Sequence, residues 1–447
     1  MTEALIQAGR EQAERILLAN GGELGLLGSN QAYKQVWARD SMLCGFGLLL
    51  CRDQEGAAIF RRSLATLRRY QSPLGKVPHN VGLANLDDPA LVAHGGSLEG
   101  EEGRVVMDTA HAGCVDGNLW YIVGHYAHYA ATGGLDLLRE AWPSLEAALL
   151  WLRYQDSNEC GLLEVHEAMD WADLFVNRYN VLYDNVLYYA CWQGMAQMAS
   201  ALGLEPEPYT SGALDVHMKL NAVLWVGPES PRDWSWLASE RKEWVYTLRR
   251  LETELVERPF YLPYLAFRDY ADRFDTLGNL LAILFGVADE PKANKILDYI
   301  HGCGLNEPYP VRALYPVIQE GERDWREYYR VRNLNLPHHY HNGGAWPFIG
   351  GIYVAALVQA GRLEEARRQL AKLADMNRQG RRGEWEFNEW FHGLSGRPMG
   401  YGGQSWSAAM FLFAADAVAT GRVNILNAER GWAAGATAMV QAASPRA

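Results

Sequence analysis

Apolar residues recur along most of the chain with the spacing of a helix that is buried on one side. In the first twenty residues, Leu5, Ala8, Ala13, Ile16 and Leu17 share one face, and Gly21-Gly22 ends the segment. Similar segments are predicted near 40–51, 55–71, 113–133, 135–154, 180–203, 210–225, 274–287, 291–300, 344–361, 362–376 and 403–420. The pattern therefore predicts about twelve helices and no sheet as the main body.

Many of these segments form pairs joined by a short turn, such as Thr132-Gly133-Gly134 or Ala360-Gly361. Helices in pairs fit a ring of six helical hairpins, the (α/α)6 barrel. A superhelical solenoid is the alternative, but the chain has no repeat of fixed period. We predict an all-α protein with a single (α/α)6 barrel over residues 1–430. The small, weakly polar residues 431–447 are expected to form a loosely ordered tail.

Long segments rich in Gly, Trp, His, Asp and Asn separate the predicted helices. Loops of this length in a compact domain usually carry function. We therefore expect them to gather at one end of the barrel and to build the site there. They comprise residues 72–112, 156–179, 226–270, 302–343 and 379–402.

Charge and composition narrow the function classes. Asp plus Glu is 53 against 41 Lys plus Arg, a formal net charge of −12, which disfavours nucleic acids and anionic membrane surfaces as partners. No apolar run is long enough to span a bilayer, and the charged N-terminal segment does not resemble a signal peptide. The six cysteines form no CxxC pair. We expect a cytoplasmic protein that acts on a small molecule, and a homo-oligomer is compatible with these features.

Acidic residues stand beside aromatic residues in four of the loop regions, which suggests carbohydrate chemistry. Hydrolysis of a glycoside needs two carboxyl groups that flank the scissile bond. A carboxyl packed between Trp and Met, as Asp170 is, loses water and its pKa rises. A solvated loop acid near a core Trp is the alternative for each group. The four groups are Trp37-Ala-Arg39-Asp40, Cys114-Val-Asp116-Gly-Asn118-Leu-Trp120, Glu167-Ala-Met169-Asp170-Trp171-Ala-Asp173 and Trp385-Glu386-Phe387-Asn388-Glu389-Trp390.

Two patterns could suggest a metal. Residues 156–167 nearly spell a calcium loop, but Cys160 is a poor ligand for a hard cation. The run His338-His339-Tyr340-His341 is better explained as a polar loop that binds a ligand by hydrogen bonds. Motifs for nucleotides, nucleophilic serine and zinc proteases are absent. We expect no cofactor and no metal.

Five segments of the chain resemble those of the neutral/alkaline invertases, an (α/α)6-barrel glycoside hydrolase family. They occur in the same order between about residues 33 and 415. They are YKQVWARDSMLCGFGLLL, HAGCVDGNLWYIVGHYAHYAATG, DTLGNLLAILFGVAD, HHYHNGGAWPFIGGIYVAAL and FNEWFHGLSGRPMGYGGQSWSAAMFLF.

The resemblance implies a general acid at Asp170 and a general base at Glu389. The loop HEAMDWAD is more similar to glucosidases, mannosylglycerate hydrolases and debranching enzymes of the same barrel, and Glu167 and Asp173 are rival acids in it. We expect an exo-acting enzyme that cleaves sucrose or another short α-glucoside with inversion. Asp40 and Arg39 would hold the sugar. Further substrate-binding candidates are Trp37, Asp116, Trp120, Trp171, His341, Asn342, Trp346, Gln404 and Trp406.

Two other activities remain open at this level. A glucosylglycerate or mannosylglycerate hydrolase would need a cationic patch for the carboxylate of its substrate. A sugar isomerase or epimerase would use paired histidines for proton transfer, and residues 338–341 together with His392 offer these. The candidates for the cationic patch are Arg178, Arg330, Arg332 and Arg381.

Overall fold

The computed structural model describes residues 2–83, 97–99, 105–107, 114–227, 242–255 and 257–424. Helices dominate this part of the chain, and the strands are short and paired antiparallel. The helices are α1 (Thr2–Ala19), α2 (Ala38–Leu48), α3 (Gln54–Arg69), α5 (Asp116–Thr132), α6 (Leu135–Arg153), α7 (Leu182–Leu202), α8 (Glu207–Val223), α10 (Lys242–Glu254), α11 (Thr276–Leu284), α12 (Glu290–Gly302), α13 (Pro347–Gln359), α14 (Leu363–Arg378), α15 (Ser405–Thr420) and the 3-10 helix η2 (Glu327–Asn333).

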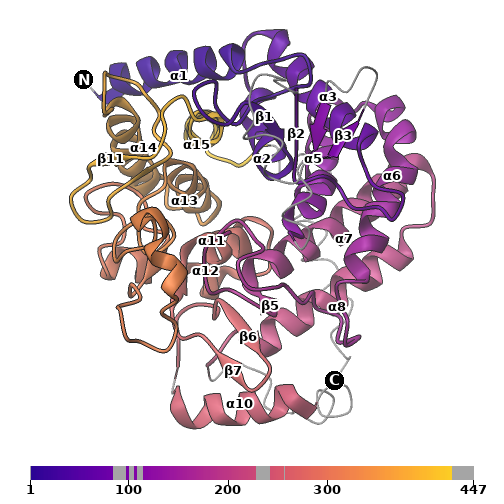
Figure 1. Cartoon of the computed structure of the whole chain (residues 1–447), viewed down its shortest axis with the longest axis vertical. Coiled ribbons are helices and arrows are strands. Elements are labelled where there is room, and N and C mark those ends of the chain that lie inside the picture. The colour runs from indigo at the N-terminus through magenta and orange to yellow at the C-terminus, as the bar shows by residue number, and fades with distance from the viewer. Residues whose placement is uncertain are drawn as a thin grey trace.

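Two concentric rings of helices form an (α/α)6 barrel, which confirms the predicted fold class (Figure 1). In the inner ring each helix contacts the next, and α15 closes the ring on α2. Each outer helix packs on an inner one and returns the chain to the end where the next inner helix begins. The inner helices are α2, α5, α7, α11, α13 and α15, and the outer helices are α1, α3, α6, α8, α12 and α14.

Sequence composition explains why the helices divide into two rings. The inner helix α13 is buried at every position from Pro347 to Val358, whereas the outer helix α3 buries a single stripe that includes Ile59, Leu64 and Leu67. A Cβ atom at Gly351 of α13 would lie 2.3 Å from the carbonyl oxygen of Met410, so glycine permits the close approach of α15. Among the described helices, none has both the length and the apolar character needed to cross a membrane.

The loops gather at the N-terminal ends of the inner helices. The first amide of α2 donates to the carbonyl of His79, and that of α7 donates to the carbonyl of Pro263. Likewise the Thr276 amide of α11 donates to Ala313, and the Ser405 amide of α15 donates to Gly28. Amides that a helix leaves unpaired are thus satisfied by loop carbonyls. Because all inner helices begin at this end, their N-terminal residues converge there.

Short strands join these loops to one another. The pairs are β1 with β2, β2 with β4, β3 with β4, β5 with β6, β6 with β7, β8 with β9, and β10 with β11. The bounds are β1 (Gln35–Trp37), β2 (Asn80–Leu83), β3 (Ser97–Glu99), β4 (Val105–Met107), β5 (Asn180–Val181), β6 (Tyr264–Ala266), β7 (Asp269–Tyr270), β8 (Phe274–Asp275), β9 (Leu314–Tyr315), β10 (Trp390–Phe391) and β11 (Pro398–Met399).

The twelve predicted helices are present, but α10 lies in a segment that was predicted to be a loop. Its buried face consists of Trp244, Val245, Leu248 and Leu251, a helical spacing that the Trp- and Pro-rich surroundings obscure. It lies at the edge of the molecule beside β6 and β7 (Figure 1). The predicted tail at 431–447 is outside the described residues.

Candidate active site

The guanidinium of Arg39 connects three of the predicted acidic segments. Its Nη1 atom donates to Asp116 Oδ2 at 2.7 Å and to the backbone carbonyl of Asp170 at 3.3 Å. Its Nε atom lies 3.5 Å from Asp40 Oδ1. Asp116 also accepts a hydrogen bond from the Tyr183 hydroxyl at 3.2 Å. Arg39 therefore joins the first turns of α2 and α5 to the loop that carries Asp170.

Asp170 is 1% exposed, and its carboxyl group is held from two sides. The amide of Ala172 donates to Oδ1 at 2.7 Å, and Asn177 Nδ2 donates to Oδ2 at 3.2 Å. Burial raises the pKa of Asp170 to about 7, the charge of Asp116 adds to the increase, and the hydrogen bond from Asn177 opposes it. This carboxyl is thus substantially protonated near neutral pH.

Glu389 precedes β10 and is 4% exposed. The hydroxyl of Tyr33 donates to Oε1 at 3.1 Å, and the Tyr401 amide donates to Oε2 at 3.3 Å. Burial raises the pKa of Glu389 to about 7, although both donors favour its ionised form. At Gly400, where φ is +66°, a Cβ atom would lie 2.5 Å from Oε2. The glycine therefore leaves room for this carboxylate.

Asp40 and Asp173 lie within electrostatic reach of Glu389. The charges of both residues contribute to the raised pKa of Glu389. Burial raises the pKa of Asp40 itself to about 6, while Arg39 opposes the increase. The fold thus brings Asp40, Asp173 and Glu389 close together. These residues come from distant parts of the chain, as do Tyr33 and its partner Glu389, which are 356 positions apart.

The two rival acids of the Asp170 loop are both stabilised in their ionised form. Arg326 binds Glu167 with two hydrogen bonds, at 2.8 and 3.2 Å, and the Tyr328 hydroxyl donates a third at 2.8 Å. These donors hold the pKa of Glu167 below its usual value despite partial burial. Contact with His341 likewise lowers the pKa of Asp173. Neither group has the protonation state of a general acid at neutral pH.

Several of the predicted stacking residues form a closed aromatic cluster instead of an open platform. Trp346 is 0% exposed, with the His341 ring stacked on it at 5.4 Å and Trp171 meeting it at 5.6 Å. Trp406 contacts Trp346 at 5.5 Å. In this arrangement the faces of Trp346 are covered by protein, so it supports the site rather than presenting a surface for sugar.

Trp120 departs further from the prediction that it stacks on substrate. It lies one turn into α5, is 1% exposed and donates from its indole nitrogen to the Tyr183 hydroxyl at 2.7 Å. Tyr183 in turn donates to Asp116. Trp120 is therefore a core residue that orients the partner of Asp116.

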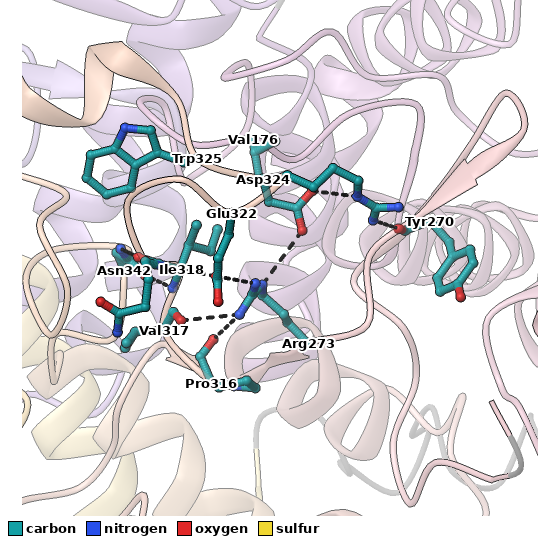
Figure 2. A network of polar contacts seen from close by, with 12 residues as sticks. Val176, Tyr270, Arg273, Pro316, Val317, Ile318, Glu322, Asp324, Trp325 and Asn342 are labelled. Carbon is teal, nitrogen blue, oxygen red and sulfur yellow. Dashed lines mark hydrogen bonds and ion pairs between the residues drawn. The ribbon is translucent and has the colours of Figure 1, made fainter. Parts of the chain in front are cut away.

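Asn342 was also predicted to bind substrate, but its side-chain amide is fully occupied by backbone groups. Oδ1 accepts from the Ile318 amide at 2.7 Å, and Nδ2 donates to the carbonyls of Ile318 and Asn335 at 2.9 and 3.1 Å. Figure 2 shows this pair beside a network in which Arg273 binds Glu322 and the carbonyls of residues 316 and 317. Asn342 thus fixes the loop before α13.

Buried polar atoms without a hydrogen bond are found among the predicted site residues. Several predicted site residues have a buried polar atom that makes no hydrogen bond with protein, among them Trp37 Nε1, Asp40 Oδ1, Trp171 Nε1, Gln404 Nε2 and Trp406 Nε1. Buried polar groups normally have partners. These four donors and one carboxylate acceptor suit the hydroxyl groups of a sugar.

Three positions that lie beside the candidate acids escaped the prediction. Tyr33, which holds Glu389, stands within the quoted segment YKQVWARD and could have been selected there. Tyr401 supplies a backbone amide, which no sequence pattern reveals. Asp184, in the first turn of α7, has both carboxyl oxygens buried without a hydrogen bond, and burial raises its pKa well above the usual value. The charge of Asp170 adds to that increase, so the two carboxyls are close.

The histidines expected to form a polar loop do lie together. The His339 and His392 rings are 4.7 Å apart, and His338 and His392 are 6.2 Å apart. The Nδ1 atom of His392 accepts from the amides of Leu394 and Ser395, at 3.3 and 3.2 Å. Within the described residues, no group of three or more His, Cys, Asp or Glu side chains is arranged to hold a metal ion.

Part of the chain matches a known family. The family described as alkaline and neutral invertase matches residues 265–420, which include Glu389 but not Asp170. Alkaline/neutral invertase E, chloroplastic, of Arabidopsis thaliana is 38% identical over 96 residues, 21% of this chain and 15% of that protein. Cytosolic invertase 1 of Oryza sativa subsp. japonica is 33% identical over 147 residues, 32% of this chain and 25% of that protein. The chain thus matches at most about a quarter of the length of these two relatives.

Solved structures match the whole barrel. Mannosylglycerate hydrolase from Thermus thermophilus, in complex with glucose, superposes with a TM-score of 0.62 and 17% identity, covering 90% of this chain and 98% of that one. A bacterial glucoamylase complexed with acarbose has a TM-score of 0.60 and 13% identity, covering 92% of this chain and 55% of that one. The chain therefore has the (α/α)6 barrel found in these glycosidases, and over residues 265–420 it resembles the alkaline and neutral invertases.

Proposed function

We propose that this protein is an exo-acting glycoside hydrolase that cleaves a short α-linked glycoside by single displacement with inversion. One observation carries the proposal. Buried donors without hydrogen bonds, together with Asp40, occur in the same set of loops as two buried carboxyls with raised pKa, Asp170 and Glu389. The resemblance to invertases and the shared barrel of glycosidases support the same class of activity.

Asp170 would act as the general acid. Its pKa of about 7 keeps the proton available near neutral pH, and transfer of that proton to the glycosidic oxygen releases the leaving group. The Ala172 amide and Asn177 then stabilise the carboxylate that remains. Glu167 and Asp173 are less suitable because their partners keep them ionised.

Glu389 would act as the general base. Its carboxylate takes a proton from water as that water attacks the anomeric carbon from the face opposite the leaving group. Tyr33 and the Tyr401 amide orient the carboxylate, and the raised pKa makes it a stronger base than an exposed glutamate. The sugar would lie against Trp37, with its hydroxyls donating to Asp40.

Hydrolysis fits the site better than isomerisation. An isomerase would need histidines poised at the sugar, but His341 is 3% exposed within the aromatic cluster, and His392 is engaged by backbone amides. The carboxyl pair, by contrast, has the burial and protonation that acid–base cleavage requires.

We expect kcat/KM to follow a bell-shaped pH profile with its maximum near neutral pH. Activity needs Glu389 ionised, so it falls as the pH drops through the pKa of Glu389, about 7. It also needs Asp170 protonated, so it falls again as the pH rises through the pKa of Asp170, also about 7. Initial rates between about pH 5 and 9 measure both limbs. A rate that rises steadily to high pH would contradict this assignment of the acid.

A panel of glycosides tests the activity. Sucrose, other short α-glucosides and glycosyl-glycerates are incubated with the protein and scored for released reducing sugar, and the anomer first formed is followed by NMR. We expect release from at least one α-linked member, with the anomer of inverted configuration. Glu389→Gln is the inactive control, and exposed Glu364→Gln on α14 is its matched control with normal activity. No release from any member would refute the proposal.

A further inference from the structure

The carboxylate of Asp173 is more accessible than those of Asp40, Asp170 and Glu389. Its side chain is 29% exposed, compared with 13% for the side chain of Asp40. Asp170 and Glu389 are almost completely buried. The negative charge of Asp173 raises the pKa of Glu389, of Asp40 and of the Tyr33 hydroxyl, so its carboxylate lies near these groups. The mechanism proposed above assigns it no role.

His341 lies beside Asp173 without cancelling its charge. The Nε2 atom of His341 lies 3.5 Å from Asp173 Oδ1. The ring itself is wedged between Trp346, stacked at 5.4 Å, and Trp171, whose ring centre is 4.7 Å away. Burial lowers the pKa of His341, so near neutral pH the ring is mainly uncharged, and Asp173 keeps its negative charge.

Four arginines of this region, among them the predicted candidates Arg178 and Arg330, are already paired with acids, whereas Arg381 donates to the carbonyl of Gly400. Arg39, the arginine whose charge acts on Asp173, donates to Asp116. Arg178 binds Asp269 at 2.8 Å and approaches Glu167 at 3.6 Å. Arg326 is bound twice by Glu167, and Arg330 is bound by Glu320. A substrate carboxylate could bind one of these four arginines only by displacing the acid that it already contacts.

Asp173 would lie on the side of the site where the leaving group departs. A general acid stands beside the glycosidic oxygen, on the side where the leaving group departs. Asp173 follows Asp170 by three residues in the same loop and is the more exposed of the two. A carboxylate on a leaving group at this position would therefore meet the negative charge of Asp173, and the four arginines named above are already engaged by acids.

We propose that Asp173, beside His341, is a specificity residue that admits an uncharged polyol as leaving group and rejects one that bears a carboxylate. The inference rests on the proposed glycosidase function and refines it. Juxtaposed like charges are an effective way to discriminate against a competing ligand. This protein would thus reject a glycerate leaving group, although it shares its barrel with a protein named mannosylglycerate hydrolase.

A matched pair of substrates tests the proposal. Glucosylglycerol and glucosylglycerate share the sugar and the linkage and differ in one group, a hydroxymethyl or a carboxylate. We expect kcat/KM of the wild type to favour glucosylglycerol by about tenfold or more. Asp173→Asn, which keeps the shape of the side chain but removes its charge, should reduce that preference by about tenfold, mainly through KM of the glycerate compound. Exposed Asp136→Asn on α6 is the matched control and should leave the ratio unchanged.

A second measurement does not depend on the variant. Raising the salt concentration screens the repulsion, so the preference of the wild type should narrow between low and high ionic strength. If other glycosides are cleaved but neither member of the pair is, the two compounds are compared as competitive inhibitors. The glycerate compound should then bind more weakly, and Asp173→Asn should remove the difference.

The outcomes separate the inference from the function on which it rests. Equal rates on both compounds, or a preference that Asp173→Asn and salt leave unchanged, would overturn the role of Asp173 while the glycosidase activity stands. Failure to cleave any glycoside at any pH tested would refute the proposed function, and the specificity role would fall with it.

Discussion

Asp170→Asn is expected to lower kcat on a glycoside with a poor leaving group by about 10²- to 10⁴-fold, with little change in KM. The amide preserves the shape, and its oxygen can still accept from the Ala172 amide. Asn177 can turn its own amide oxygen toward the new NH2 group, but the variant has no acidic proton to transfer. The loss therefore falls on the transition state rather than on substrate binding. Steady-state kinetics on the best substrate of the panel, after circular dichroism has verified the fold, measures the effect.

Leaving-group chemistry separates the acid from the base. The aryl oxide of an activated aryl glycoside departs without being protonated. Such a substrate should therefore restore much of the rate of Asp170→Asn. The same substrate should not rescue Glu389→Gln, because water still lacks its base. Near-normal turnover of Asp170→Asn, together with an Asp173→Asn or Glu167→Gln variant that is inactive on every glycoside, would assign the acid to that neighbour.

Arg39→Met is expected to lower the free energy of unfolding by about 3–5 kcal/mol. The change removes the partner of Asp116, which is 0% exposed, and leaves Asp40 without its nearby cation. The loss should exceed any local packing effect because an unpaired charge remains buried. Urea or thermal unfolding followed by circular dichroism measures it.

A surface ion pair and a double variant serve as controls. They separate the effect of the buried charge from that of losing any arginine. Arg139 binds Asp136 at 3.0 Å on the exposed side of α6, so Arg139→Met should cost less than about 1 kcal/mol. Arg39→Met combined with Asp116→Asn should recover part of the lost stability, because the second change removes the buried charge. Equal stability of Arg39→Met and the wild type would show that the buried pair does not hold the site together.

Fold prediction succeeded because the signal for each helix is local. An outer helix such as α3 has a buried stripe at helical spacing, and an inner helix such as α13 is apolar throughout. Turns such as Gly133 end the helices in the left-handed conformation that glycine favours. The helix α10 has the same local signal in Trp244, Leu248 and Leu251, but the composition around it resembles a loop. The sequence alone was therefore sufficient for the barrel.

Candidate residues could be found from sequence, but their states could not. Asp170 and Asp173 are three residues apart with similar aromatic neighbours. Only the folded chain buries Asp170 near Asp116 and places His341 beside Asp173, so the pKa of the first carboxyl rises and that of the second falls. The protonation state depends on burial and on charges from distant segments, which no local pattern contains.

The same limit applies to the side chains that were predicted to bind substrate. Trp120, Asn342 and Trp346 have residue types that bind sugars well, and they occur in the right segments. Packing across the barrel engages their polar atoms and faces with protein instead, through Tyr183, Ile318 and His341 respectively. The amino-acid sequence determined the helices, the loops and the set of candidate acids. Tertiary structure alone decided which acid is protonated, which aromatic ring is covered and which polar atoms stay free for a ligand, because each of these depends on contacts between segments far apart in the chain.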